Sequence, residues 1–239
     1  MAGDSGCHLG LESRPISSAG ASVPELDHPQ GVWLAPEQNP FGIRVLDCRA
    51  FCRSMMSLSS DLSIALKFGE LRRTGGSHLR GATPANARRV AYPLCYAASR
   101  KLAAPRNGPL FHAATMEDKW DIVLDGEWLV FARSWTGAPV YRAGVLCTKE
   151  EMKVSPIELD GNEITDPEFA VRQVDFLIKS HLLEAEVPHP LPPGFPDDAD
   201  RILIYSFQQY GRHAAYATFA DTLRLGNRQR FDPDATMPL

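Results

Sequence analysis

The chain has 239 residues, of which 44% are hydrophobic and 23% are charged, and its net charge is −4. These values are ordinary for a globular protein and exclude a collagen-like, coiled-coil or wholly disordered chain. No run of about 18 apolar residues is present, so we expect neither a membrane-spanning helix nor a membrane partner.

Cysteine usage and the N-terminus bear on location. The five cysteines are odd in number and irregularly spaced, which argues against a disulfide framework and favours a reducing compartment. No basic stretch followed by an apolar one opens the chain, so no signal peptide is predicted and we expect a cytoplasmic protein. Cys48 and Cys52 could bind a metal with His78 or His112, but zinc sites usually have two close ligand pairs. We therefore expect small buried or half-buried thiols, and neither a metal nor a cofactor.

The first 40 residues contain five glycines, five prolines and five serines without helical or strand periodicity. This composition predicts a flexible tail, or one loosely pinned by Val32, Trp33 and Leu34. We expect residues 41–239 to form a single α+β domain.

Three elements precede the centre of the expected domain. Residues 41–47 alternate as a strand, and a cap at 60–61 predicts a helix that continues to about residue 73. Residues 89–96 predict a second strand, which Pro93 places at a sheet edge. The apolar stripe of the expected helix consists of Leu62, Ala65, Leu66 and Leu71.

Charge is unevenly distributed. Residues 67–106 contain nine lysines and arginines and one acid, a net charge of +8, which leaves −12 for the remainder. Such asymmetry can mark an anionic partner, but it is more often a solvated loop. The segment has few aromatic residues and no recognisable nucleic-acid module, so we do not expect nucleic acid as the partner.

The stretch 119–145 predicts an antiparallel meander, which we extend to about residue 160. Asp125-Gly126 favours a type I′ hairpin, which places Leu124 opposite Glu127. Thr136-Gly137 would close the second hairpin with another two-residue loop. This loop length would place Phe131 opposite Arg142.

Two arginines fall on the more apolar face of this meander. An unpaired buried charge costs several kcal/mol, so a guanidinium there needs a carboxylate, a phosphate or an aromatic ring. Either both arginines lie at the sheet rim over aromatic rings and pair with an internal acid, or Arg133 or Arg142 contacts an anionic ligand. The residues of this face are Trp120, Ile122, Leu129, Phe131, Arg133, Trp135, Val140 and Arg142.

The clearest helix is predicted at 166–184. Thr165 or Asp166 is its N-cap, Pro167 takes the first helical position, and an apolar face follows. We expect this helix to pack on the meander sheet.

Two segments follow this helix. Residues 187–199 contain five prolines and predict an extended connector without an element of its own. Residues 200–211 alternate like a strand, but a cap at Asp198 or Asp200 and a terminating Gly211 favour a helix.

Signatures of common enzyme classes are absent. The sequence has no P-loop, dinucleotide-binding glycine pattern, nucleophile elbow, zinc-protease motif or EF-hand loop. This absence favours a protein that is not an enzyme.

The segment from Ser54 to Arg73 resembles the central motif of ADP-ribosyltransferases, a strand ending in Ser-Thr-Ser followed by a helix with Ala and Phe. The resemblance implies an NAD site in which the serines support the nicotinamide ribose pocket and Arg44 or Arg49 contacts NAD. The Glu-x-Glu motif of the family is missing from its expected position, because the matching residues 184–186 lie much too far downstream. The matching residues are Ser57, Leu58, Ser59, Ala65 and Phe68.

A second resemblance concerns the meander, which is similar to a WxI…DG…FxRSWTG pattern in uncharacterised bacterial proteins, some of them associated with ADP-ribose-processing enzymes. Arg133, Ser134 and Trp135 would present a guanidinium, a hydroxyl and an aromatic ring before a turn. Such a set can clamp a phosphate and stack a base or ribose.

We therefore expect an intracellular, non-catalytic interaction or ligand-binding protein that recognises an anionic nucleotide-like group. Its partner would be a protein or an anionic small molecule. The competing hypothesis is an enzyme of NAD or ADP-ribose chemistry. The candidate ligand-binding residues are Trp120, Arg133, Ser134, Trp135 and Arg142. The residues of the alternative NAD site are Arg44, Ser57 and Ser59.

Overall fold

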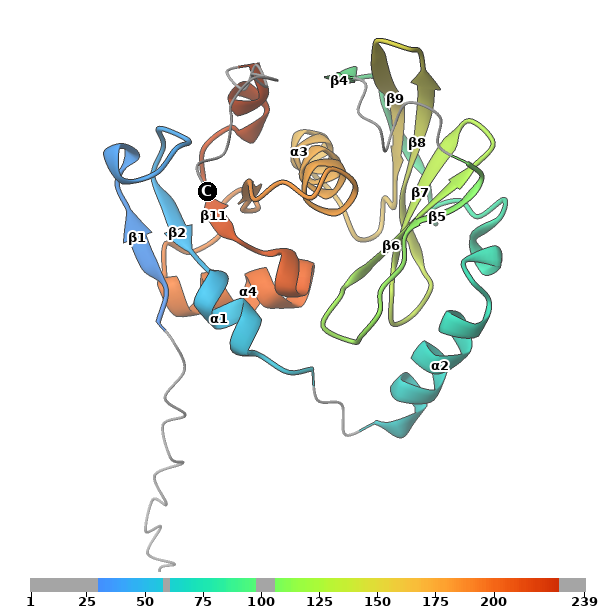
Figure 1. Ribbon diagram of the computed structural model, residues 1–239, viewed down its shortest axis with the longest axis horizontal. Helices are drawn as coiled ribbons and strands as arrows, with labels where there is room; N and C mark the ends of the chain where they lie inside the picture. Colours follow the sequence, from blue (N-terminus) through green and yellow to red (C-terminus); the bar gives the residue numbers. More distant parts are fainter. Residues whose placement is uncertain (1–29, 58–60, 98–105, 228–239) are drawn as a thin grey trace, which may run out of the picture.

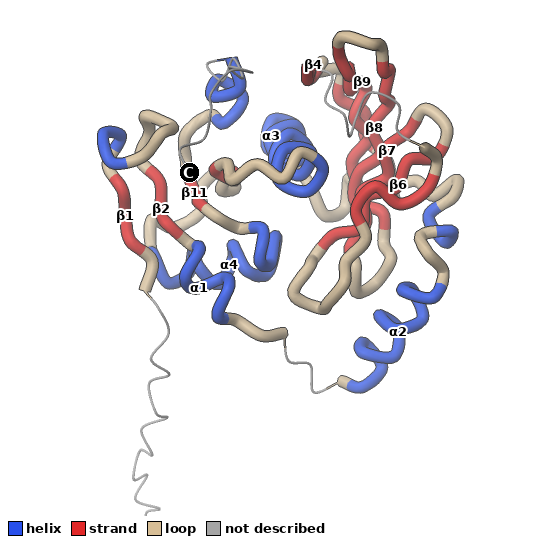
Figure 2. The backbone as a smooth tube through the Cα atoms, viewed as in Figure 1, coloured by secondary structure: helices blue, strands red, loops and turns tan. Residues whose placement is uncertain are grey.

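The structure is a computed structural model that describes residues 30–57, 61–97 and 106–227. It has the α+β fold expected from the sequence, with two sheets and the helix α3 (Pro167–Leu177) between them. Figure 1 shows the smaller sheet with α1 and α4 on one side of α3 and the larger sheet on the other. Figure 2 shows α2 on the outer side of the larger sheet.

The larger sheet contains the predicted meander and is antiparallel throughout. Its strand order is β3-β9-β8-β7-β6-β5, and β4 also pairs with β9. The single strand predicted at 89–96 is divided into β3 and β4 around Pro93, and both lie at the sheet edge that was expected. The strands are β3 (Arg88–Val90), β4 (Leu94–Ala97), β5 (Gly108–Phe111), β6 (Trp120–Asp125), β7 (Trp128–Arg133), β8 (Pro139–Cys147) and β9 (Glu151–Leu159).

The smaller sheet joins distant segments of the chain. Its order is β1-β2-β11-β10, in which only β10 and β11 run parallel. One strand lies in the segment 187–199, so the prediction of a connector without an element was wrong there. Another lies within the expected N-terminal tail. The strands are β1 (Val32–Leu34), β2 (Val45–Asp47), β10 (Pro188–Pro190) and β11 (Tyr216–Thr218).

The helices begin where the sequence provides caps. The side chains of Asp61, Asp166 and Asp198 each accept a hydrogen bond from a backbone N–H in the first turn that follows. The helix predicted at 200–211 is thereby confirmed. Among the described residues no helix is long and apolar enough to cross a membrane. The other helices are α1 (Arg49–Ser54), α2 (Leu62–Arg73) and α4 (Ala199–Tyr210), with short 3-10 turns at Pro36–Gln38, Ser77–Leu79, Gly211–His213 and Thr222–Asn227 and a π turn at Ile178–Leu182.

The apolar stripe expected on α2 does not form a buried face. Leu62 and Leu66 are 72% and 64% exposed, and only Leu71 is buried. The main core lies elsewhere, between the larger sheet, α3 and α4, where the largest buried side chains include Trp120, Phe131, Tyr141, Phe176 and Tyr210. Burial of such aromatic side chains is the main source of stability.

The first hairpin differs from its predicted register without changing the faces. Asp125 pairs with Trp128, so the two loop residues are Gly126 and Glu127. Only Gly126 of these two has a positive φ (62°), which is the pattern of a type II′ turn rather than the predicted type I′. Leu124 therefore lies opposite Leu129 rather than Glu127. A shift of two residues keeps each side chain on its expected face.

The second hairpin was predicted wrongly. The turn takes in residues 134–137, since Gly137 N–H donates to the Arg133 carbonyl, and a bulge follows where Ala132 pairs with Pro139 and Phe131 with Tyr141. The bulge slips the register by one residue. Arg142 consequently pairs with Val130 and lies on the face opposite to the one expected.

Candidate functional site

A pocket of about 490 Å³ opens where four segments distant in the sequence meet. These segments are the end of α1 with residues 55–57, the residue before β6, the β7–β8 turn, and α4. We call it the cationic pocket, because Lys119 and Arg133 line it. Its other lining residues are Phe51, Met55, Met56, Ser57, Trp135, Thr136, Ile204, Phe207 and Gln208.

Lys119 is almost fully buried, with 6% of its surface exposed. Its Nζ donates to Ser57 Oγ at 2.6 Å and to the Met116 carbonyl at 2.8 Å, and it lies 4.4 Å from the centre of the Trp135 ring and 4.6 Å from that of Phe207. Burial in these surroundings lowers the pKa of the ammonium to about 8, although acidic neighbours oppose this effect. Lys119 is therefore partly neutral at mildly alkaline pH.

Arg133 supplies the second positive charge. Its guanidinium lies over the Trp120 ring at 4.2 Å from the ring centre and donates to the Gln209 side chain at 2.6 Å. Among the described residues no carboxylate forms an ion pair with either Lys119 or Arg133. Two cations thus border one pocket, and no described carboxylate contacts either of them directly.

Ser57 is held beside Lys119 by the loop that precedes β6. Its backbone N–H donates to Glu117 at 2.9 Å, and its hydroxyl donates to the Met116 carbonyl at 3.0 Å. Trp135 Nε1 donates to the same carbonyl at 2.7 Å. The carbonyl oxygen of Met116 therefore gathers a lysine, a serine and a tryptophan at the pocket.

A glycine allows this loop to approach the end of α4. Gly211 has φ +58°, and a Cβ added there would lie 1.6 Å from the Glu117 carbonyl oxygen. Only a residue without a side chain fits this contact. Arg212 also lies 3.8 Å from the Glu117 carboxylate. Gly211 thus lets the loop carrying Lys119 pack against the helix carrying Phe207.

The remaining wall of the pocket is largely apolar. Phe51 and Phe207 are buried at its base, whereas Met56 and Ile204 are 69% and 51% exposed at its rim. Exposed apolar side chains beside a pocket are a common feature of ligand sites.

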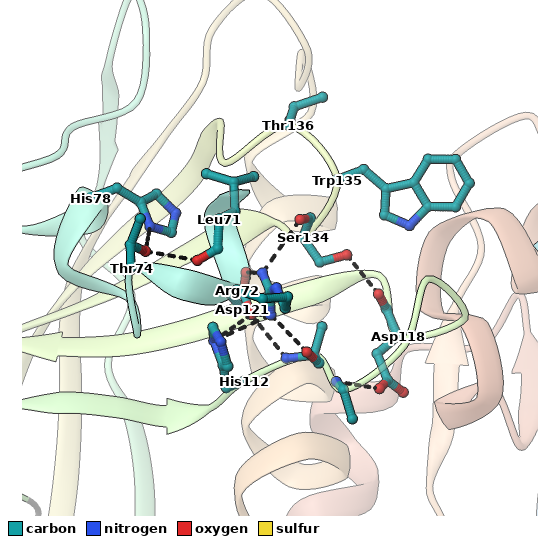
Figure 3. A network of polar contacts seen from close by, with 12 residues as sticks. Leu71, Arg72, Thr74, His78, His112, Asp118, Asp121, Ser134, Trp135 and Thr136 are labelled. Atoms are coloured by element: carbon teal, nitrogen blue, oxygen red, sulfur yellow. Dashed lines mark hydrogen bonds and ion pairs between the residues drawn. The ribbon is translucent and has the colours of Figure 1, made fainter. Parts of the chain in front are cut away.

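The opposite face of β6 and β7 contains a network of polar groups that bond to one another (Figure 3). Asp121 has no exposed surface, and it accepts two hydrogen bonds from Arg72 of α2 and one from the backbone N–H of Ala113 at 2.9 Å. His112 Nδ1 lies 3.2 Å from the same carboxylate. We call these residues the Asp121 network. It fixes α2 to the sheet.

The structure brings only part of the predicted ligand site together. Arg133 and Trp135 line the pocket, while Trp120 is fully buried beneath Arg133 and donates its Nε1 hydrogen to the Gln209 carbonyl at 2.7 Å. Ser134 is also buried, and its hydroxyl donates to the Asp118 carbonyl at 2.6 Å. Figure 3 shows Ser134 toward the Asp121 network and Trp135 pointing away from it. Trp120 and Ser134 therefore support the site without lining it.

Arg142 lies outside the pocket because of the register slip. Its guanidinium is 4.0 Å from the centre of the Trp128 ring and 3.9 Å from Glu158. The expectation that it shares a face with Arg133 was wrong. Asp121 pairs with Arg72 of α2 rather than with an arginine of the meander.

The residues of the alternative NAD site are separated. Ser57 lines the cationic pocket, whereas Arg44 pairs with Asp197 at 2.8 Å, lies over Trp33 and is not among the pocket residues. Arg49 pairs with Asp47 at 2.7 Å. Ser59 lies outside the described residues, and the segment before Ser57 forms helix α1 rather than a strand.

The sequence did not indicate Lys119 as a site residue. Lys119 precedes the first residue of β6, and its side chain turns toward α4. Phe207 and Ile204 come from a helix whose position depends on tertiary packing. The adjacent Met55 and Met56 were the only local signal of an apolar surface there.

Comparisons of the chain with protein-family models, with curated proteins and with solved structures find no match.

Proposed function

We propose that this protein binds a small organic anion in the cationic pocket. The ligand would have a phosphate or carboxylate group joined to an aromatic or aliphatic body, as in a nucleotide or an organic acid. The observation that carries this proposal is the pair of pocket cations, Lys119 and Arg133, without a carboxylate partner among the described residues.

The electrostatic reason is the cost of uncompensated charge. A buried ion without a partner loses several kcal/mol of hydration free energy, and a bound anion would offset this cost by direct pairing. Arg133 presents a planar guanidinium suited to two parallel hydrogen bonds with a phosphate or carboxylate. Lys119 would add a point charge nearby.

The apolar wall supports the second half of the ligand. Phe51, Phe207 and Ile204 offer an apolar surface, and the Trp135 ring can stack against a planar group. A volume of about 490 Å³ lies within the range of small-molecule sites. The pocket therefore suits a compact molecule rather than a polymer.

The proposal is tested by titration calorimetry with pairs of ligands that differ only in charge. We use AMP and adenosine, decanoate and decanol, together with NAD and ADP-ribose. We expect an anionic member to bind at least 10-fold more tightly than its neutral counterpart, and the chemical class of the best ligand separates nucleotides from organic acids. Equal binding of charged and neutral members, or no binding by any of them, would contradict the proposal.

The protein provides a matched control for this experiment. Arg133 and Arg142 both lie over a tryptophan ring, at 4.2 and 4.0 Å, but only Arg133 lines the pocket. We expect Arg133→Met to weaken binding of the anion at least 10-fold and Arg142→Met to leave it unchanged. Equal losses in both variants would mean that the effect is not local to the pocket.

We also propose, as a second candidate, chemistry on NAD or ADP-ribose. It is favoured by the position of Ser57 in the same pocket as Arg133. Because Arg44 is engaged with Asp197, Arg133 would take the role that the resemblance gave to an upstream arginine. Incubation with NAD should then release nicotinamide in the wild type and not in Arg133→Met. Intact NAD after prolonged incubation would exclude this candidate.

A further inference from the structure

Ser57 and Lys119 form the closest pairing of a nucleophile and a base in the cationic pocket. Lys119 Nζ lies 2.6 Å from Ser57 Oγ, and both side chains line the cavity. This distance is within the range for proton transfer between a serine hydroxyl and a general base. Serine and lysine act together in this way in some hydrolases unrelated to the serine–histidine–aspartate type.

The Met116 carbonyl explains why the serine proton can be transferred. Its oxygen lies within hydrogen-bond distance of three donors: Trp135 Nε1 at 2.7 Å, Lys119 Nζ at 2.8 Å and Ser57 Oγ at 3.0 Å. A carbonyl oxygen has two lone pairs, and the ring N–H of tryptophan can only donate. Once Lys119 loses a proton, its nitrogen becomes an acceptor for the Ser57 hydroxyl.

The surroundings favour the neutral form of Lys119. Burial lowers its pKa to about 8, and none of the described carboxylates forms an ion pair with it. A pKa near 8 leaves about a tenth of the lysine neutral at pH 7 and most of it neutral at pH 9. Lysines that serve as general bases require such a lowered pKa.

We propose that Ser57 is the nucleophile and Lys119 the general base of an acyl-transfer site for esters of apolar acids. This goes beyond anion binding, which needs only the positive charges. The apolar side chains of Phe51, Met55 and Phe207 would hold the acyl chain. Arg133 lines the same pocket and supplies positive charge for the developing oxyanion.

The proposed reaction proceeds in two balanced steps. Ser57 Oγ forms a bond to the ester carbonyl carbon as its proton passes to Lys119 Nζ. The carbon–oxygen bond to the alcohol then breaks, and the alcohol leaves with the proton from Lys119. In the second step water loses a proton to Lys119 and attacks the acyl-serine. Ser57 leaves with that proton, and the carboxylic acid is released.

The test is covalent labelling of the full chain with an alkyl fluorophosphonate, followed by peptide mass spectrometry. The serine oxygen attacks phosphorus and fluoride leaves, so the label identifies the nucleophile. We expect labelling of Ser57, with a rate that rises with pH through about 8. The same preparation should hydrolyse p-nitrophenyl butyrate. Folded wild-type protein that carries no label on Ser57 between pH 7 and 10 would overturn the proposal.

Variants separate catalysis from folding. Ser57→Ala should abolish both labelling and hydrolysis. Lys119→Met should slow labelling of Ser57 about 100-fold. The control is Ser63→Ala, at an exposed serine, which should change neither labelling nor hydrolysis. Labelling of Lys119→Met at the wild-type rate would also overturn the proposal. If Lys119→Met does not fold, the pH profile of wild-type labelling decides the question, since a rate independent of pH contradicts a lysine base.

The outcome is distinguishable from that of the anion-binding proposal. Ser57→Ala keeps both pocket cations, so it should still bind the best anion from the calorimetric panel. Binding without any labelling would leave the anion site and reject the acyl-transfer chemistry. Labelling without anion binding would support the acyl-transfer chemistry and reject the anion site.

Discussion

Cationic side chains lie on both faces of strands β6 and β7, but the two faces provide them with different partners. On the outer face Arg72 forms a bidentate ion pair with Asp121, whose carboxylate has no exposed surface. On the inner side Lys119 and Arg133 contact aromatic rings, carbonyl oxygens and a glutamine. One face of the sheet thus holds a neutralised ion pair, and the other holds two cations for which the described residues provide no carboxylate in direct contact.

This difference indicates which charges serve the fold. The Asp121 network joins α2 to the sheet, and removing one partner would leave the other charge buried and alone. Within the part of the chain that the structure describes, the cations of the cationic pocket have no carboxylate partner that their removal would leave unpaired. Their cost to the fold is explained if they exist to contact a ligand.

The largest expected effect comes from breaking the Asp121 network. Asp121→Ala leaves the Arg72 guanidinium largely buried without its carboxylate, and we expect a loss of about 3–5 kcal/mol in the free energy of unfolding. Urea unfolding followed by circular dichroism measures this loss. A loss below about 1 kcal/mol would mean that the pair is not a structural element.

A second prediction concerns the pocket face and the backbone contact between Gly211 and Glu117. Gly211→Ala places a Cβ against the Glu117 carbonyl and strains a residue with positive φ, so we expect a loss of about 2–4 kcal/mol. Gly42 has a similar φ of +64° with no atom within 4 Å of an added Cβ, so Gly42→Ala is the control and should cost less. Equal losses in urea unfolding would show that the contact with Glu117 is unimportant.

A smaller effect concerns buried groups that the fold keeps neutral. His189 is fully buried, and burial lowers its pKa to about 3, so between pH 6.5 and 3 the unfolded chain binds a proton that the folded protein does not. Its contribution to stability is therefore constant above pH 6.5 and is lost on acidification, by about 2 kcal/mol at pH 5. Urea unfolding at pH 7 and pH 5 measures the loss.

The variant His189→Phe isolates this contribution from the carboxylates that titrate in the same range. Phenylalanine keeps the aromatic contacts with Phe176 and Tyr210. We expect its unfolding free energy to fall less between pH 7 and pH 5 than that of the wild type. An identical decrease in both proteins would assign the acid sensitivity to other groups.

Local signals in the sequence predicted much of the fold. Asp166-Pro167 marked the start of α3, and Asp198 with Gly211 marked both ends of α4, because capping depends on neighbouring residues only. The faces of the first hairpin also followed, since alternation survives a shift of two residues. The second hairpin failed because its longer turn and bulge are held by distant contacts, including the bond from Trp135 to Met116.

The site was predictable only in part for the same reason. Arg133 and Trp135 stood out because a charge and an aromatic ring flank a turn. Lys119 did not stand out, since its surroundings come from α4 and from the segment after α1. For α2 the sequence predicted a buried face that does not form. The apolar periodicity is present, but Leu62 and Leu66 have no partner surface among the described residues.

The comparison of the two faces is tested most directly by removing one cation from each. We would measure urea unfolding of Arg72→Met and Lys119→Met at pH 7 beside the wild type. We expect Arg72→Met to lose about 3–5 kcal/mol, because Asp121 is left buried and unpaired. Lys119→Met should lie within about 1 kcal/mol of the wild type, because the folded protein disfavours the ammonium that it removes. A loss in Lys119→Met as large as that in Arg72→Met would make Lys119 a structural residue and contradict the account.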